Sequence, residues 1–212
     1  MTFPSYPYHM RITLLAAVCL LTGCLARPHL EKQSFIFSLP SRSALAGATG
    51  NRVLRVRTLQ VAPPFEGKAL VYRTGEFSYD RDPYAEFLVS PSEGLISPIC
   101  SRWREAGVFN AVAEAGSALK PDTLVEIHVS QLYGDFRQSE NPTAVLTIRF
   151  IFFDAHAYVP EKVMLQREYS RAIPIKERTA TALIEGWNQA LAQILDSAVV
   201  DFGRADTDAP KP

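Results

Sequence analysis

The chain has 212 residues, 47% of them hydrophobic and 10% aromatic, so it can bury a substantial core in one domain. Lysine and arginine together number 22, as do aspartate and glutamate, and this balance argues against a nucleic-acid-binding surface. Near the start, Arg11 is followed by a mostly apolar run from Ile12 to Leu21, and then by Thr22, Gly23 and Cys24. One positive charge, a short apolar run and a small-residue site are typical of a secretory signal peptide.

The last four residues of this stretch, Leu21-Thr22-Gly23-Cys24, resemble the lipobox of bacterial lipoproteins. In that family the cysteine is acylated on sulfur with fatty acids such as palmitate, the preceding peptide bond is cut, and the new amine is acylated. The resemblance implies cleavage between Gly23 and Cys24 and lipidation of Cys24. A transmembrane helix or a buried core helix is the competing interpretation, but the run is much shorter than the roughly 20 apolar residues of a membrane span. Translation could begin at Met1, although a start at Met10 would give a more typical leader.

These features predict a signal peptide, a lipidated tether, a single domain and a disordered tail over residues 1–23, 24–34, 35–203 and 204–212. Alternating apolar residues predict strands over residues 35–39, 53–61, 69–73, 77–80, 108–113, 123–133, 143–154 and 163–173. The last three are long and separated by short loops, so we expect them to pair as an antiparallel meander. Within residues 143–154, Ile151 and Phe153 predict that this end of the strand is covered on both faces. Residues 84–89 are not assigned.

Two helices are predicted. Ser90, Pro91 and Glu93 form a capping-box pattern that starts the first helix, and Gly107 is suited to follow its end. The second helix runs from about Lys176 to Phe202 with one continuous apolar stripe, and Gly203 is expected to end it. The predicted fold is therefore α+β, with a mostly antiparallel, possibly mixed, sheet and both amphipathic helices packed on one face.

The sequence offers little chemistry outside Cys24. Cys19 leaves with the leader, and Cys100 lies on the apolar face of the first helix, which predicts a buried, inert thiol. His128 lies on the polar face of a strand, and Asp154 and His156 alone are a weak metal site, since several ligands must converge. We therefore predict no catalytic residue, no metal and no cofactor. A periplasmic enzyme remains an alternative that a deep pocket with perturbed acids would support.

The segments after Cys24 resemble the ABC-type transport auxiliary lipoproteins, which include the paraquat-inducible-protein-C-like lipoproteins. The matching segments are the aromatic-x-Leu strand Phe37-Ser38-Leu39, the stretch LRVRTLQVAPPFEGKALVYRTGEFSYDRDPYAEFLVSP at 54–91, and WNQALAQIL at 187–195 in the closing helix. The sequence departs from the family over residues 84–87, where many members carry a tryptophan.

The resemblance implies a non-enzymatic lipoprotein of the outer membrane that faces the periplasm. Members work beside a permease, an ATPase and an MCE-domain substrate-binding protein to move lipids or hydrophobic solutes across the envelope. Leu25 rather than aspartate follows Cys24, so the inner-membrane retention signal typical of enterobacterial lipoproteins is missing. An envelope assembly or structural lipoprotein unrelated to ABC transport is the second hypothesis.

Overall fold

The computed structural model describes residues 31–40, 50–114, 116–157 and 162–208, so Gly23, Cys24 and the last four residues lie outside it. A compact unit begins at Lys32. Its strands are β1 (Gln33–Phe35), β2 (Val53–Val61), β3 (Ala69–Arg73), β4 (Tyr79–Phe87), β5 (Ala111–Ala113), β6 (Thr123–Asp135), β7 (Thr143–Asp154) and β8 (Val163–Pro174). Its helices are the 3-10 turn η1 (Pro63–Phe65), α2 (Pro91–Gly94), α3 (Ile96–Glu105) and α4 (Ala180–Asp208).

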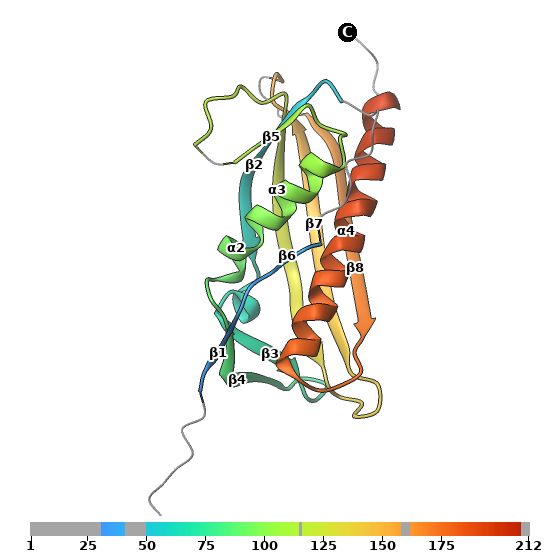
Figure 1. Cartoon of the computed structure of the whole chain (residues 1–212). Coiled ribbons are helices and arrows are strands. Elements are labelled where there is room, and N and C mark those ends of the chain that lie inside the picture. The colour runs from blue at the N-terminus through green and yellow to red at the C-terminus, as the bar shows by residue number, and fades with distance from the viewer. Residues whose placement is uncertain (1–30, 41–49, 115, 158–161, 209–212) are drawn as a thin grey trace, which may run out of the picture. The chain divides into compact units, whose positions relative to one another are not determined.

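The eight described strands form one mixed sheet (Figure 1). Strands β2 and β3 both pair with one edge of β6, whereas β7 pairs with its other edge and β8 follows β7. Strand β5 pairs with β2, and β4 and then β1 continue outward from β3. Pairs β1–β4, β2–β5, β2–β6 and β3–β6 are parallel, and pairs β3–β4, β6–β7 and β7–β8 are antiparallel. The prediction of a mostly antiparallel sheet is therefore wrong. Pro63 and Pro64 end β2 and form η1. Strands β2 and β3 therefore follow one another along the same edge of β6, and both are parallel to it.

The long strands behave as their alternation predicts. Strands β6, β7 and β8 pair as an antiparallel meander. On β7, the side chains of Leu146, Ile148, Phe150 and Phe152 are all at most 1% exposed and share one face. The expected coverage at Ile151 and Phe153 is wrong, because both are only half-buried. Both faces of β7 are covered instead at its other end, residues 143–147. This end lies beside an aromatic cluster of Phe65 from η1, Tyr79 from β4 and Tyr133 from β6.

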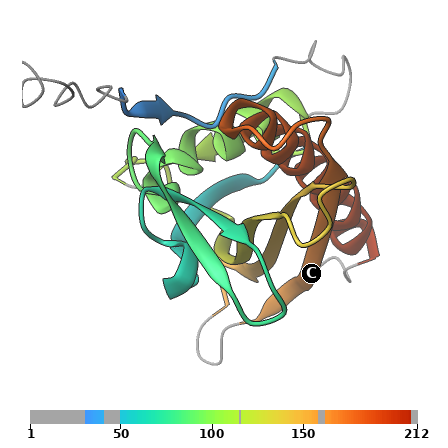
Figure 2. The same cartoon turned by 90° about the horizontal axis from the view of Figure 1, so that it is seen from below.

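Helices α3 and α4 lie side by side against the same face of the sheet (Figures 1 and 2). Trp103 of α3 packs edge-on against Phe150 with ring centroids 5.4 Å apart, and Phe202 of α4 packs on Phe152 at 4.8 Å. These aromatic contacts place the main core between the two helices and β7. The predicted capping box is present, because the backbone N–H of Ser90 donates to the Glu93 carboxylate at 3.2 Å.

The ends of the helices show where local preference is overridden. Gly107 follows α3 in a left-handed conformation, with φ 68°, as predicted. Helix α4, however, begins at Ala180 and continues through Gly203 to Asp208, so residues 204–208 do not belong to a disordered tail. An interior glycine costs a helix only about 1 kcal/mol. The extra turns gain an ion pair, with Arg52 Nε 2.6 Å from Asp206 Oδ1.

Gly186 is the point where α4 comes closest to the sheet. A Cβ atom at this position would lie 2.6 Å from Ala144 Cβ on β7 and 2.9 Å from Ile175 Cγ2 after β8. Neither neighbour is the far end of a flexible side chain, so the helix axis would have to move away from the sheet. Gly203, in the same helix, has nothing within 4 Å of the equivalent position.

Two alanine substitutions in α4 should therefore have opposite effects. Gly186→Ala should destabilise the protein by about 1–3 kcal/mol through overpacking, although alanine favours a helix. Gly203→Ala should stabilise it by about 0.5–1 kcal/mol, since only the helix preference changes. Urea unfolding of both variants and the parent measures the two shifts. Stabilisation by Gly186→Ala would contradict the close approach.

Candidate docking surface

Exposed apolar side chains gather at the β1–β4 edge of the sheet and its hairpin. Of the nine large hydrophobic residues that are exposed in the described ranges, six lie there: Ile36, Phe77, Tyr79, Tyr84, Leu88 and Val89. Single exposed apolar residues are ordinary on protein surfaces, whereas a gathering along one edge is typical of an interaction site. We call this set the apolar edge.

The β3–β4 hairpin presents Phe77 at its tip, where the side chain is 88% exposed. The turn is closed by the N–H of Thr74, which donates to the Ser78 carbonyl at 3.0 Å. Arg73 braces it further, because its guanidinium donates to the carbonyls of Gly75 and Glu76 and lies over the Tyr79 ring. Phe77 is therefore held outward by a supported turn.

A wide bulge in β4 turns Tyr84 outward. Residue 69 pairs with Glu86 and residue 71 pairs with Arg81, so one residue of β3 faces the four residues 82–85. Asp82 holds the bulge, since its carboxylate accepts the N–H groups of Tyr84 and Ala85 at 2.8 and 2.9 Å and the hydroxyl of Tyr72. Desolvation, followed by the nearby carboxylate, raises the pKa of Tyr72, so its hydroxyl stays a donor. Bulges commonly re-aim a side chain, as this one does.

The root of the hairpin is fixed in the core. Phe87, the last residue of β4, stacks on Phe37 with centroids 4.8 Å apart and on Trp187 at 5.7 Å. Strand β1 is the short edge strand, and it pairs parallel to β4, with Gln33 opposite Ala85. The segment that follows β1 is tied to α4, because the N–H of Ser38 donates to Asn188 Oδ1 at 3.1 Å. The predicted strand at residues 35–39 is thus largely an extended segment after β1.

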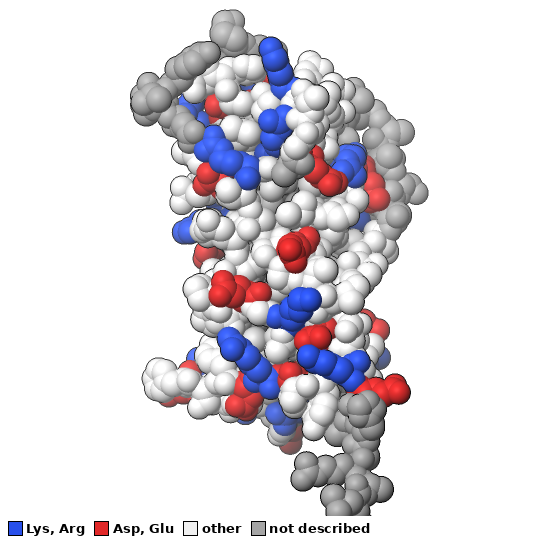
Figure 3. All heavy atoms as spheres, turned by 90° about the vertical axis from the view of Figure 1, so that its left-hand side faces the viewer, with Lys and Arg blue, Asp and Glu red and all other residues white. Residues whose placement is uncertain are grey.

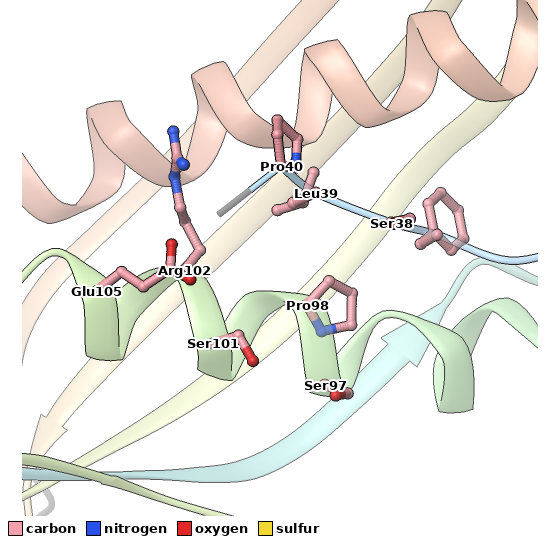
Figure 4. A pocket seen from close by; sticks show the side chains of 9 residues that line it. Ser38, Leu39, Pro40, Ser97, Pro98, Ser101, Arg102 and Glu105 are labelled. Atoms are coloured by element: carbon pink, nitrogen blue, oxygen red, sulfur yellow. The ribbon is translucent and has the colours of Figure 1, made fainter. Parts of the chain in front are cut away.

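The hollow in Figure 4 lies between this segment and α3, and it has a volume of about 250 Å³. Arg102 points from α3 toward α4 and donates to both carboxylate oxygens of Asp196, each at 2.9 Å. These two hydrogen bonds form a bidentate link between the two helices, and the Arg102 side chain that makes it is only 7% exposed. This hollow is bounded by a structural ion pair.

The face of the sheet opposite the helices carries a row of polar residues at one level. Gln60, His128, Arg149 and Glu168 are successive partners across β2, β6, β7 and β8. They line a shallow hollow of about 320 Å³, and the Nε atom of Arg149 is buried there without a hydrogen-bond partner. The position of His128 on a polar face is as predicted, but it has no second histidine beside it in the described part of the chain.

The structure separates the residues of the weak metal candidate. The N–H of His156 donates to Asp154, while its ring nitrogen Nε2 lies 3.0 Å from Asp122 Oδ1. Asp122 also accepts the Val53 N–H at 2.7 Å, and this hydrogen bond, followed by the one with His156, lowers the pKa of the carboxyl. Among the residues described, no group of three or more histidine, cysteine, aspartate or glutamate side chains converges to hold a metal ion.

Cys100 is fully buried in α3, as predicted, and burial raises the pKa of its thiol to about 11. Such a thiol stays protonated at neutral pH and is a poor nucleophile. None of the helices within the described ranges is long and apolar enough to cross a membrane.

The described unit is thus a mixed eight-stranded sheet covered on one face by α3 and α4. No protein-family model and no curated protein matches the sequence. Among solved structures, the chain resembles the protein XCC0632 from Xanthomonas campestris, described with the family model DUF330, with 16% identity and a TM-score of 0.70 over 84% of this chain and 100% of that one. A structure described as an uncharacterized protein matches with 13% identity and a TM-score of 0.64 over 81% and 98%. At these identities the likeness shows a shared fold.

The sequence predicts a lipidation site at Cys24, which lies outside the described residues, but it did not single out the apolar edge. Period-2 alternation puts Phe77 and Tyr79 on one face of a strand, whereas the structure places Phe77 in the turn. The sequence Asp82-Pro83 was a usable signal, since aspartate followed by proline favours a turn and here starts the bulge.

We expect Asp196→Ala to destabilise the protein by about 2–3 kcal/mol, since it leaves the Arg102 guanidinium without this partner. Glu185→Ala is the matched control, because this exposed carboxylate lies on the same helix, and its loss should change the free energy of unfolding by less than about 0.5 kcal/mol. Urea unfolding at neutral pH compares the two. Equal effects would show that the link between α3 and α4 contributes nothing to stability.

Asp122→Asn should cost about 1 kcal/mol at neutral pH, because Asp122 holds the start of β2 through Val53. A depressed folded-state pKa stabilises the protein above the unfolded pKa of about 3.9, and the stabilisation is lost as pH falls through the folded value. The difference between parent and variant should therefore be constant above about pH 5 and shrink below about pH 4. Urea unfolding from pH 7 to pH 3 measures it, with Glu140→Gln in the exposed β6–β7 turn as control. A difference that grows on acidification would contradict the lowered pKa.

Proposed function

We propose that this chain is an outer-membrane lipoprotein, held through acyl chains on Cys24, which acts as a non-enzymatic auxiliary component of an MCE/ABC-type transport system for lipids or hydrophobic solutes. In this role the domain is a docking module for an MCE-domain protein whose permease and ATPase lie in the other membrane. The domain faces the periplasm.

One observation supports the proposal above the others. The three segments that carry the resemblance to the transport auxiliary lipoproteins are far apart in sequence, and they meet in a single aromatic stack. Phe37 comes from the first segment and Trp187 from the third, and Phe87 ends the stretch of the second segment, residues 84–87, in which this chain departs from the family. The stack makes the three segments parts of one packed unit, and their order behind a lipobox is more specific than any one motif.

The anchoring follows from the chemistry of Cys24. A single acyl chain binds a membrane only marginally, whereas several chains hold a protein stably. Lipidation on both the sulfur and the new amine would supply several chains at one residue. Leu25, in place of aspartate, favours the outer membrane.

Affinity purification from detergent-solubilised membranes tests the proposal. The tagged parent should be lipidated, fractionate with the outer membrane and recover an MCE-domain protein or an ABC component. Cys24→Ser should block acylation, because serine lacks the thiol that is acylated, and leave an uncleaved precursor in the inner membrane. Mass spectrometry of the N-terminal peptide and membrane fractionation measure both effects.

Cys100→Ser is the matched control, because Cys100 is buried in the folded domain. This substitution should leave lipidation and fractionation unchanged. Normal outer-membrane fractionation of Cys24→Ser would overturn the anchoring. A lipidated protein that recovers neither an MCE-domain protein nor an ABC component would overturn the transport role. That result would favour an assembly or structural lipoprotein.

A further inference from the structure

The β3–β4 hairpin has the chemistry of a membrane-interface contact. Phe77 at the tip is 88% exposed, and Tyr79 and Tyr84 on the same hairpin are 45% and 49% exposed. Tyrosine favours the boundary between acyl chains and water, because one end of its ring is apolar and the other is polar, and phenylalanine adds apolar area that enters the edge of the acyl region. The supported turn around Arg73 means that these rings are presented without first having to be ordered.

The predicted tether limits how far this hairpin can be from a bilayer. Lys32 lies eight positions after Cys24 in the sequence, and an extended chain spans at most about 3.6 Å per position, so the leash reaches about 29 Å at most. The compact unit is entered at the β4 edge, since Lys32 pairs with Glu86 at 2.6 Å and Gln33 lies opposite Ala85. Because β1 and β4 are parallel, the chain comes in from the side of the hairpin tip.

The opposite end of the sheet provides a comparison. Strand β6 runs for 13 residues, about 43 Å, from Thr123 to Asp135. Its last residue pairs with Arg73 beside the hairpin, and the loop just before Thr123 carries Leu119, which is 51% exposed. Leu119 is therefore an exposed apolar residue at the end of the sheet remote from the hairpin (Figure 1).

Charge does not single out anionic lipid. Arg73 and Arg81 lie near the tip, and so do Glu76 and Asp80. Basic and acidic side chains are interspersed over the side of the molecule seen in Figure 3. The attraction expected of this hairpin is thus that of aromatic side chains for the interface, with little dependence on the fraction of anionic lipid.

We infer that the tip of the β3–β4 hairpin, led by Phe77, inserts into the phospholipid interface of the membrane that holds Cys24, as a second contact beside the lipid anchor. This rests on the proposed lipidation of Cys24. Tyr84, turned outward by the bulge, lies farther from the tip on the same hairpin.

Tryptophan fluorescence tests the insertion, because the two native tryptophans, Trp103 and Trp187, are fully buried and supply a constant background. The Phe77→Trp variant of the mature, lipidated protein is reconstituted into phosphatidylethanolamine and phosphatidylglycerol vesicles, with and without lipids brominated near the headgroup end of their acyl chains. The emission added by this substitution should shift to the blue and be quenched by the brominated lipids. Leu119→Trp is the matched control, and its added emission should be unaffected by bromination.

The outcomes separate the two proposals. If the protein floats with the vesicles but Phe77→Trp responds no more than Leu119→Trp, the insertion is overturned and the anchor stands. If the protein does not float, the anchor fails and the insertion with it. If aqueous iodide reaches the Phe77→Trp site in vesicles but not in native membranes, the occupant of the hairpin is a protein, and the inference is overturned.

Discussion

The close approach of α4 to the sheet at Gly186 is the constraint on which the arrangement of this domain depends. It brings the next residue, Trp187, into the core, where its indole N–H donates to the Val145 carbonyl at 3.0 Å. The same ring stacks on Phe87, which in turn stacks on Phe37. The last helix therefore fixes the root of the hairpin and the segment after β1 together. A side chain at position 186 would lift the helix and loosen three distant parts of the chain at once.

Local rules predicted the elements better than their pairing. The alternation in β6, β7 and β8 and the capping box at Ser90 depend on nearby residues, and the structure confirms them. The parallel pairings of β2 and β3 with β6 depend on contacts between segments some 60 residues apart. No local pattern distinguishes them from antiparallel neighbours, because a strand buried on one face alternates in the same way in either direction. The end of α4 was missed for a similar reason, since the Arg52–Asp206 ion pair is visible only in the folded chain.

The two candidate functional features, Cys24 and the apolar edge, differ in the same way. Lipidation of Cys24 is predicted from sequence, because the lipobox is a short linear motif that does not depend on the fold of the domain. The apolar edge could not be predicted in this way. Phe77 alternates with Tyr79 as a core residue would, and only the turn at residues 74–78 and the bulge at residues 82–85 show that Phe77 and Tyr84 are exposed. Both features are built by hydrogen bonds rather than by hydrophobic pattern. The exposure of these aromatic side chains is a property of the fold, and the hydrophobic pattern of the sequence does not predict it.

A short leash changes how strong a second membrane contact has to be. A tether of seven residues between Cys24 and Lys32 keeps the domain at an effective concentration of about millimolar near the surface, so a contact too weak to bind free protein can still be well populated. The exposed Phe77 side chain with Tyr79 beside it is a contact of this weak kind. The anchor alone would leave the domain free to rotate, whereas a hairpin held at the interface would fix which faces point away from the membrane. The β5–β6 loop end of the sheet, about 43 Å along β6 from the hairpin, would then be presented toward partners from the other membrane.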